Sequence, residues 1–231
     1  MNMKRAQRGP TNNQRDTARV EAFSDGVFAI AITLLVLNLR VPEGRSQENL
    51  WTLLWNQWSM FLGYITSFIV LGIIWLNHHH MFTYIHKTDR GLLIWNTFAL
   101  MFVAFIPYPT ALVAQYIGTE NGKIAVVIYS ATLLIVTILY NFLWWYATAG
   151  HRLVEQEIDT HVLRTITRSY LLGVPLYSLS LVVALINVEA SLLMYIMIAI
   201  LYLLFAGVFD SRKYDIHLVR NMSISGETLD R

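Results

Sequence analysis

The sequence contains no cysteine among its 231 residues, which excludes disulfide bonds, thiolate metal sites, iron–sulfur clusters and thiol nucleophiles. It is also poor in charge, because Asp, Glu, Lys and Arg together make up 14% of the chain. No glycine-rich phosphate loop, nucleophile elbow or pair of catalytic carboxylates occurs along it. We therefore expect neither an enzyme nor a nucleic-acid partner.

The sequence contains several long apolar runs. Hydrophobic residues make up 55% of the chain, and its mean hydropathy is +0.47. Six runs approach the ~20 residues that a helix needs to cross a hydrocarbon core of ~30 Å. They cover residues 20–39, 58–80, 91–114, 123–147, 168–187 and 190–209. Runs of this length favour helices over strands, so the sequence predicts an all-α, polytopic membrane protein with six transmembrane helices.

The lysines and arginines lie mostly on one side of the predicted spans. Of the 17, 14 fall in the two tails and in the second and fourth loops between spans. By the positive-inside rule both termini are cytoplasmic, as an even number of spans also requires. We expect a flexible basic N-terminal tail (residues 1–18), a transmembrane domain (19–210) and a cytoplasmic C-terminal tail (211–231).

Two local patterns refine this picture. Pro107 and Pro109 are expected to end or kink the third span, because proline cannot donate a helical hydrogen bond. Val154, Ile158 and Val162 recur every four residues among charged neighbours, which predicts an amphipathic helix on the cytoplasmic face. This helix is expected to lie in the membrane interface or to extend the fifth span.

The first apolar run begins with charged residues, in the stretch RVEAFSDGVFAIAITLLVL that starts at Arg19. Ser24 and Asp25 are ordinary N-cap residues, so a helix that begins at Gly26 is one interpretation. A helix from Gly26 to Leu39 is only about 21 Å long, whereas one that begins near Arg19 is about 31 Å long and fits the core. We therefore predict that the helix includes Arg19 and carries Asp25 within the inner leaflet.

Arg19 and Asp25 need partners from other helices. They are six residues apart, about 600° around a helix, so they leave on different faces and cannot pair with each other. The predicted topology brings the end of the second span and the start of the third to the same depth. The polar and aromatic side chains there are Trp75, Asn77, His78, His79, His80, Trp95 and Asn96. Ionisable groups in a helix bundle usually face inward, pair with one another and mark functional sites.

Higher on the first helix, Ile30, Leu34 and Leu37 follow i, i+4, i+7 spacing and form one apolar stripe, with Thr33 beside it. Such a stripe is commonly ordinary packing or lipid contact. Spacing alone leaves this interpretation open beside that of a pore lining.

The motif Arg-x-x-x-Phe-Ser-Asp-Gly, formed by Arg19, Phe23, Ser24, Asp25 and Gly26, resembles the signature of the transmembrane-protein-175 family of endosomal and lysosomal potassium channels and their prokaryotic relatives. The stretch WLNHH at residues 75–79, and the block from WN at 95–96 to PYPT at 107–110, are similar to that family's second and third helices. The likeness covers most of the first three spans. A single set of six helices is similar to the prokaryotic members, which assemble as tetramers, whereas the animal channel has two sets and is a dimer.

The resemblance implies that four copies surround a central pore lined by the first helix. It implies that Ile30, Leu34 and Leu37 form an apolar constriction, with Thr33 at a neighbouring pore-facing position. It also implies that the motif and an inter-helix polar network hold the helices together without touching ions. These residues are Arg19, Phe23, Ser24, Asp25, Gly26, Trp75, Asn77, His78, His79, Trp95 and Asn96.

The implied function is a potassium-permeable, leak-like cation channel in the cell membrane, the plasma membrane of a prokaryote. Its partners are then further copies, membrane lipids and permeating K⁺, with no cofactor. The chain lacks the Thr-Val-Gly-Tyr-Gly carbonyl filter and has no regular series of arginines for voltage sensing. An apolar constriction admits an ion that sheds part of its hydration, which costs less for K⁺ than for Na⁺.

Two alternatives concern titratable residues. His78, His79 and His80, with His86, are a possible metal site or part of a metal-dependent oxidase, but consecutive histidines on a helix point about 100° apart and converge only if other helices contribute. We assign no metal. Asp25 is a possible titrating group of a proton-coupled transporter, against the simpler interpretation of a structural carboxylate neutralised by a nearby cation.

Overall fold

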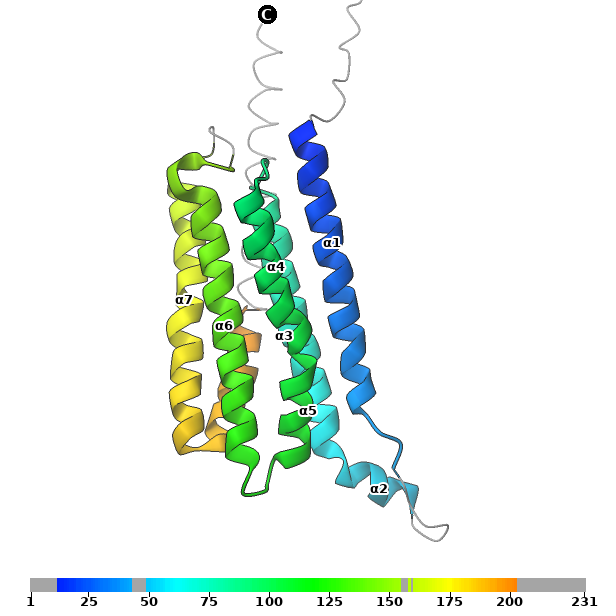
Figure 1. Ribbon diagram of the computed structural model, residues 1–231. Helices are drawn as coiled ribbons and strands as arrows, with labels where there is room; N and C mark the ends of the chain where they lie inside the picture. The colour runs from blue at the N-terminus through cyan, green and yellow to red at the C-terminus, as the bar shows by residue number, and fades with distance from the viewer. Residues whose placement is uncertain (1–11, 43–48, 155–157, 159, 203–231) are drawn as a thin grey trace, which may run out of the picture.

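The computed structural model describes residues 12–42, 49–154, 158 and 160–202, and every regular element over these residues is a helix (Figure 1). In chain order the helices are α1 (Asn12–Leu34), η1 (Leu35–Asn38), α2 (Leu50–Asn56), α3 (Trp58–Phe82), α4 (Arg90–Phe105), α5 (Pro107–Tyr116), α6 (Gly122–Thr148), η2 (Ala149–His151), α7 (Thr160–Ile186) and a last helix, Val188–Tyr202.

Five stretches in the described residues are long and apolar enough to cross a membrane. They are Asp16–Asn38, Trp58–Phe82, Arg90–Tyr116, Gly122–His151 and Thr160–Ile186. Each coincides with one of the first five predicted runs. The sixth run is described only to residue 202, as the short helix, and its remainder lies outside the described residues, as do residues 1–11 and the C-terminal tail.

α1 begins before the predicted span. It starts at Asn12, so residues 12–18 of the predicted flexible tail belong to this helix. Adding a residue to an existing helix is far easier than starting a new one, and the apolar span supplies the nucleus from which the polar N-terminal turns extend. The prediction that the helix includes Arg19 is confirmed.

The third span has the predicted proline break. α4 ends at Phe105 and α5 begins at Pro107, and Ile106 between them keeps helical backbone angles (φ −52°, ψ −39°). Pro107 has no N–H to donate, but the N–H of Thr110 donates to the carbonyl oxygen of Ile106 at 3.1 Å, so the next turn re-forms at once. The two helices therefore make one span in two segments.

The predicted amphipathic helix around Val154, Ile158 and Val162 is wrong in its first half. Val154 is buried and forms an isolated antiparallel bridge with Ile85, and α7 begins only at Thr160. The carbonyl oxygen of Leu153 accepts the N–H groups of residues 86 and 87, so this segment is held by the linker between α3 and α4. Only the second half extends the fifth span, which begins eight residues earlier than predicted.

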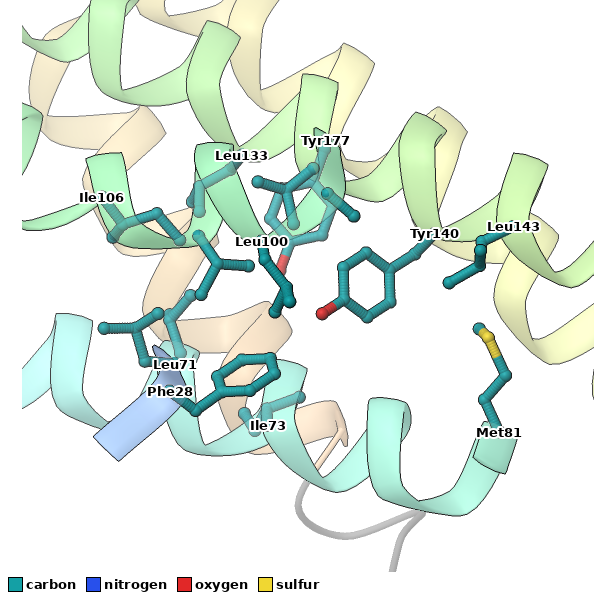
Figure 2. Close-up of a cluster of buried hydrophobic side chains, with 14 of the residues drawn as sticks. Phe28, Leu71, Ile73, Met81, Leu100, Ile106, Leu133, Tyr140, Leu143 and Tyr177 are labelled. Carbon is teal, nitrogen blue, oxygen red and sulfur yellow. The ribbon is translucent and has the colours of Figure 1, made fainter. Parts of the chain in front are cut away.

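The helices form a bundle with α1 at one edge and α7 at the opposite edge (Figure 1). The beginning of α1, the α3–α4 linker and the α6–α7 linker lie at the same end. Arg19, Lys87, Arg90, Arg152 and Arg164 are also at that end, which we call the basic end. Between the edges, buried apolar side chains from α1, α3, α4, α6 and α7 fill the interior (Figure 2).

At the basic end, Asp89 joins the two linkers. Its carboxylate caps α4 by accepting the N–H of Leu92 at 2.8 Å, accepts the Tyr146 hydroxyl at 3.0 Å, and pairs with Arg152 at 2.9 Å. Burial raises the pKa of Asp89, but these hydrogen bonds and the guanidinium outweigh it and hold the pKa below its usual value. Gly91 lies beside the Tyr146 ring at the same place.

Candidate pore helix and its polar anchor

α1 has one face packed into the bundle and one face exposed. The packed face contacts α3 and α4 and follows i, i+3 or i+4 spacing through Val20, Ser24, Phe28, Ala31 and Leu35. Because α1 lies at the edge of the bundle, its opposite face is left open (Figure 1). Polar contacts belong to the packed face and the predicted stripe belongs to the open one.

Three buried polar side chains join α1, α4 and α3. Ser24 Oγ donates to the carbonyl oxygen of Val20 at 2.8 Å and accepts from Asn96 Nδ2 at 3.0 Å. Asn96 Oδ1 lies 3.0 Å from His78 Nε2. Because the Asn96 amide nitrogen donates to Ser24, its oxygen must be the acceptor, so His78 Nε2 carries a proton and donates. We call Ser24, Asn96 and His78 the anchor network.

Two further contacts connect α1 to α3 one helical turn apart. Trp75 Nε1 donates to Asp25 Oδ1 at 2.8 Å, and His79 Nδ1 lies 2.8 Å from Glu21 Oε1. The Trp75 and His79 rings are stacked with centroids 6.0 Å apart. The described hydrogen-bond partner of Asp25 is thus a neutral indole, and no ion pair joins its carboxylate to a cation among the described residues. A single N–H donor can solvate a carboxylate at the edge of the membrane without pairing its charge.

The remaining motif residues lie away from this anchor. Arg19 is exposed, and no hydrogen bond or ion pair joins its guanidinium to the described residues. Phe23 is 60% exposed, and a Cβ added at Gly26 would meet no atom within 4 Å. The described contacts therefore give Arg19 no place in the predicted network, because it leaves α1 on the open face.

Two other predicted residues take part in different contacts. Trp95 packs against Phe142, with ring centroids 4.3 Å apart, and against Phe98 at 6.0 Å. The carbonyl oxygen of Asn77 accepts the Tyr170 hydroxyl at 3.2 Å. Both residues therefore hold α3 or α4 to neighbouring elements, but neither forms a described hydrogen bond to α1.

The predicted apolar stripe lies on the open face of α1 and η1. Ile30, Leu34 and Leu37 are 62%, 41% and 70% exposed within the single chain. Thr33 is exposed beside them and its hydroxyl donates to the carbonyl oxygen of Ala29 at 2.9 Å. That bond uses the hydroxyl proton, so the side of Thr33 presented outward is a methyl group and oxygen lone pairs.

Sequence reasoning missed two residues of α1 that contact α3, Glu21 and Phe28. Glu21 is four residues before Asp25, and the same spacing separates Trp75 from His79, so two matched pairs were visible in the sequence. Phe28 packs edge-on against the His78 ring with centroids 5.6 Å apart. Its place one turn above Ser24 on the packed face was the available signal. Among the described residues, no group of three or more His, Asp or Glu side chains could hold a metal ion.

Comparisons with known proteins identify the family of the chain. The family model of the endosomal/lysosomal potassium channel TMEM175 matches residues 19–107. A potassium channel of Chamaesiphon minutus is 39% identical over 193 residues, which are 83% of this chain and 95% of that protein. The chain belongs to the TMEM175 family. The stretch matched by the TMEM175 model runs from Arg19 through α4 and contains the whole anchor network.

One solved structure and one animal relative extend the comparison. The crystal structure of a lysosomal potassium-selective channel TMEM175 homolog from Chamaesiphon minutus matches with a TM-score of 0.76 at 37% identity, covering 83% of this chain and 98% of that one. The human endosomal/lysosomal proton channel TMEM175 is 30% identical over 142 residues, which are 58% of this chain and 28% of that protein. These TMEM175 relatives are ion channels and not enzymes.

Proposed function

We propose that the chain is a potassium-permeable, leak-like cation channel, a homotetramer whose central pore is lined by α1. The observation that carries the proposal is the division of α1 into two faces: one is hydrogen-bonded into the bundle, and the other exposes Ile30, Leu34 and Leu37. A helix fixed on one side can hold apolar side chains at a set distance from an axis on the other. The name of the Chamaesiphon relative, a potassium channel, supports the choice of ion.

Small residues on α1 support close approach of several copies. Ala22, Gly26, Ala29 and Thr33 follow i, i+4, i+7, i+11 spacing on the open face. Small residues let membrane helices approach each other closely, so their backbones can come near one axis. Larger side chains beside this stripe then determine the width of the opening between the copies.

The expected selectivity follows from dehydration. The chain has no carbonyl filter motif, so an ion passing Ile30, Leu34 and Leu37 meets side chains that cannot replace its water. Shedding part of the hydration shell costs less for K⁺ than for the smaller Na⁺, which gives a modest preference and slow conduction. We place the channel in the plasma membrane of a prokaryote, with lipids and further copies as partners and no cofactor.

Planar bilayers test the proposal directly. Purified protein is reconstituted with K⁺ on one side and Na⁺ on the other, and the reversal potential is read from the macroscopic current. A reversal displaced toward the K⁺ equilibrium potential, with current rising linearly with driving force, is the expected result. Leu34→Ala should raise the current several-fold and move the reversal toward zero, because it widens the constriction.

Leu179→Ala on α7 is the matched control. Leu179 is 53% exposed, comparable with Leu34, but lies on the helix at the opposite edge of the bundle. It should leave both current and reversal unchanged. If Leu34→Ala behaves like Leu179→Ala, the stripe does not line the pore.

A proton-coupled transporter remains the rival for this chain. Its motivation is Asp25, whose described partner is a neutral donor, so protonation would break no ion pair. Such a transporter predicts a saturable flux into liposomes that follows the pH gradient and vanishes in Asp25→Asn. A flux that rises linearly with K⁺ concentration and survives this substitution supports the channel instead.

A further inference from the structure

Two buried polar atoms, one in the anchor network and one in contact with it, have no hydrogen-bond partner among the described residues. They are His78 Nδ1 on α3 and the Tyr140 hydroxyl on α6. His78 is fully buried and Tyr140 is 8% exposed. Polar groups buried this deeply are nearly always hydrogen-bonded in native proteins, to protein or to ordered water. Each of the two atoms therefore needs a partner other than the side chains and backbone that the structure describes.

The two rings are in contact. Their centroids lie 5.9 Å apart with planes at 63°, an edge-to-face arrangement between α3 and α6. Four buried side-chain atoms of the described residues lack partners, and His78 and Tyr140 are the pair whose rings touch. No hydrogen bond joins the two atoms, so a small molecule that contacts both of them would satisfy each.

The hydrogen-bonding chemistry of the two atoms is complementary. His78 Nε2 donates to Asn96, as the direction of the anchor network requires, so Nδ1 of the neutral ring is an acceptor. The Tyr140 hydroxyl can donate or accept. A molecule between them must donate to Nδ1 and interact with the hydroxyl, and water is the smallest that does so.

There is room for water on the Tyr140 side. Tyr140 borders a cavity between α3, α6 and α7, which Ile73 and Asn77 border from α3, and the volume open to the centres of water molecules in it is about 50 Å³. About 10–15 Å³ of such volume is enough to hold one water. Figure 2 shows the Tyr140 hydroxyl directed into the interior of the cluster, between α6 and α3.

We propose that one structural water is bound between His78 and Tyr140, donating to Nδ1 and accepting from the hydroxyl. It makes the anchor network continuous from Ser24 on α1, through Asn96 and His78, to α6. The pore helix is then tied by hydrogen bonds to the centre of the bundle as well as to its neighbours α3 and α4. The inference does not depend on which ion the protein conducts.

Two measurements on the full-length protein test the site. A crystal or cryo-EM structure fine enough to resolve ordered water should show a density peak within hydrogen-bond distance of both atoms. Nitrogen-15 NMR of histidine-labelled protein should show the ring identified by its contact with the Asn96 amide protonated at Nε2, with Nδ1 shifted upfield of a free acceptor nitrogen. In Tyr140→Phe the peak should be lost and the Nδ1 resonance should move downfield.

Tyr177→Phe is the matched control. Tyr177 is also a buried tyrosine, 8% exposed on α7, and it stacks on Tyr195 rather than on His78. It should leave the Nδ1 resonance in place. A proton on Nδ1, a direct His78–Tyr140 bond with no density between them, or equal spectra for Tyr140→Phe and the parent protein would each overturn the proposal.

Discussion

Replacing Ser24 by alanine should measurably lower the free energy of unfolding. In Ser24→Ala the carbonyl oxygen of Val20 keeps its helical N–H partner, so the loss of that bond matters little. The Asn96 amide, by contrast, loses the acceptor 3.0 Å from its nitrogen at a fully buried site. Alanine fills nearly the same volume as serine, so packing contributes little to the change. The change in the free energy of unfolding therefore measures the cost of leaving the Asn96 amide donor without an acceptor.

The magnitude follows from two bounds. Side-chain hydrogen bonds between membrane helices contribute about 0.6 kcal/mol on average and up to about 1.7 kcal/mol. A buried donor left without any acceptor costs about 1–3 kcal/mol. The smaller range applies where the Asn96 amide finds partners within the membrane in the unfolded state, and the larger range applies where it finds none. We expect Ser24→Ala to lower the free energy of unfolding by about 1–2 kcal/mol, a factor of about 5–30 in the unfolding equilibrium.

Unfolding by SDS in mixed micelles, followed by circular dichroism, measures this change. Thr132→Val is the control, because Thr132 is buried on α6 and its hydroxyl donates only to the carbonyl oxygen of Ile128 in its own helix. It should shift the free energy by about 0.5 kcal/mol or less, because the Ile128 carbonyl oxygen keeps its helical N–H partner and a hydroxyl bond of this kind adds little to helix stability. Equal shifts for Ser24→Ala and Thr132→Val would refute the reasoning, because they would show that the bond between α1 and α4 adds nothing.

Three further outcomes can be checked in the same unfolding assay. Gly91→Ala should destabilise by about 1–3 kcal/mol, because the added Cβ would overlap the Tyr146 hydroxyl and the ring carbon that carries it, and in a Tyr146→Ala background the same substitution should cost less. The pKa of Asp89 is depressed in the folded protein, so its contribution is present above the unfolded value of about 3.9 and is lost as pH falls through the folded value. In Asp89→Asn the free energy of unfolding should no longer fall over that pH range. The ion pair with the exposed Arg152 should contribute less than about 1 kcal/mol of it. Asp25→Asn should stay within about 0.5 kcal/mol of the parent, because an amide oxygen still accepts the indole N–H, whereas Asp25→Leu should cost at least twice as much.

Much of the fold follows from lengths and charges alone. The apolar runs predicted the first four spans to within about four residues, because a bilayer imposes a minimum helix length, but the fifth span begins eight residues earlier than predicted. The break at Pro107 follows from covalent structure, since proline has no N–H wherever it stands. The sequence placed Ser24, Asp25, Trp75, His78 and Asn96 at one depth because successive spans cross the membrane in alternating directions. In the structure hydrogen bonds join them in two sets, Trp75 with Asp25, and His78 with Asn96 and Ser24.

The rest depended on contacts between distant segments. A helical wheel puts Arg19 and Asp25 on different faces, but it does not say which face packs, so the sequence favoured Arg19 where the structure uses Glu21. The repeat through Val154 predicted a helix because its apolar spacing is helical. The bridge to Ile85, 69 residues earlier, decides the conformation there, and periodicity within a short window contains no information about it.

The two halves of α1 are held by different kinds of contact. Ser24 and Leu34 are ten residues apart, or about 15 Å along a helix, so the anchor and the apolar stripe are separate. Near the stripe the described contacts with other elements are apolar, apart from Asn38 Nδ2, which donates to the carbonyl oxygen of Pro107 at 3.2 Å. Substitutions at the anchor should therefore change how firmly α1 is seated, whereas substitutions in the stripe remove no hydrogen bond and change the surface that α1 presents. The proposed pore lining thus predicts that open-face variants alter conduction without altering stability, and that variants of the packed face do the reverse.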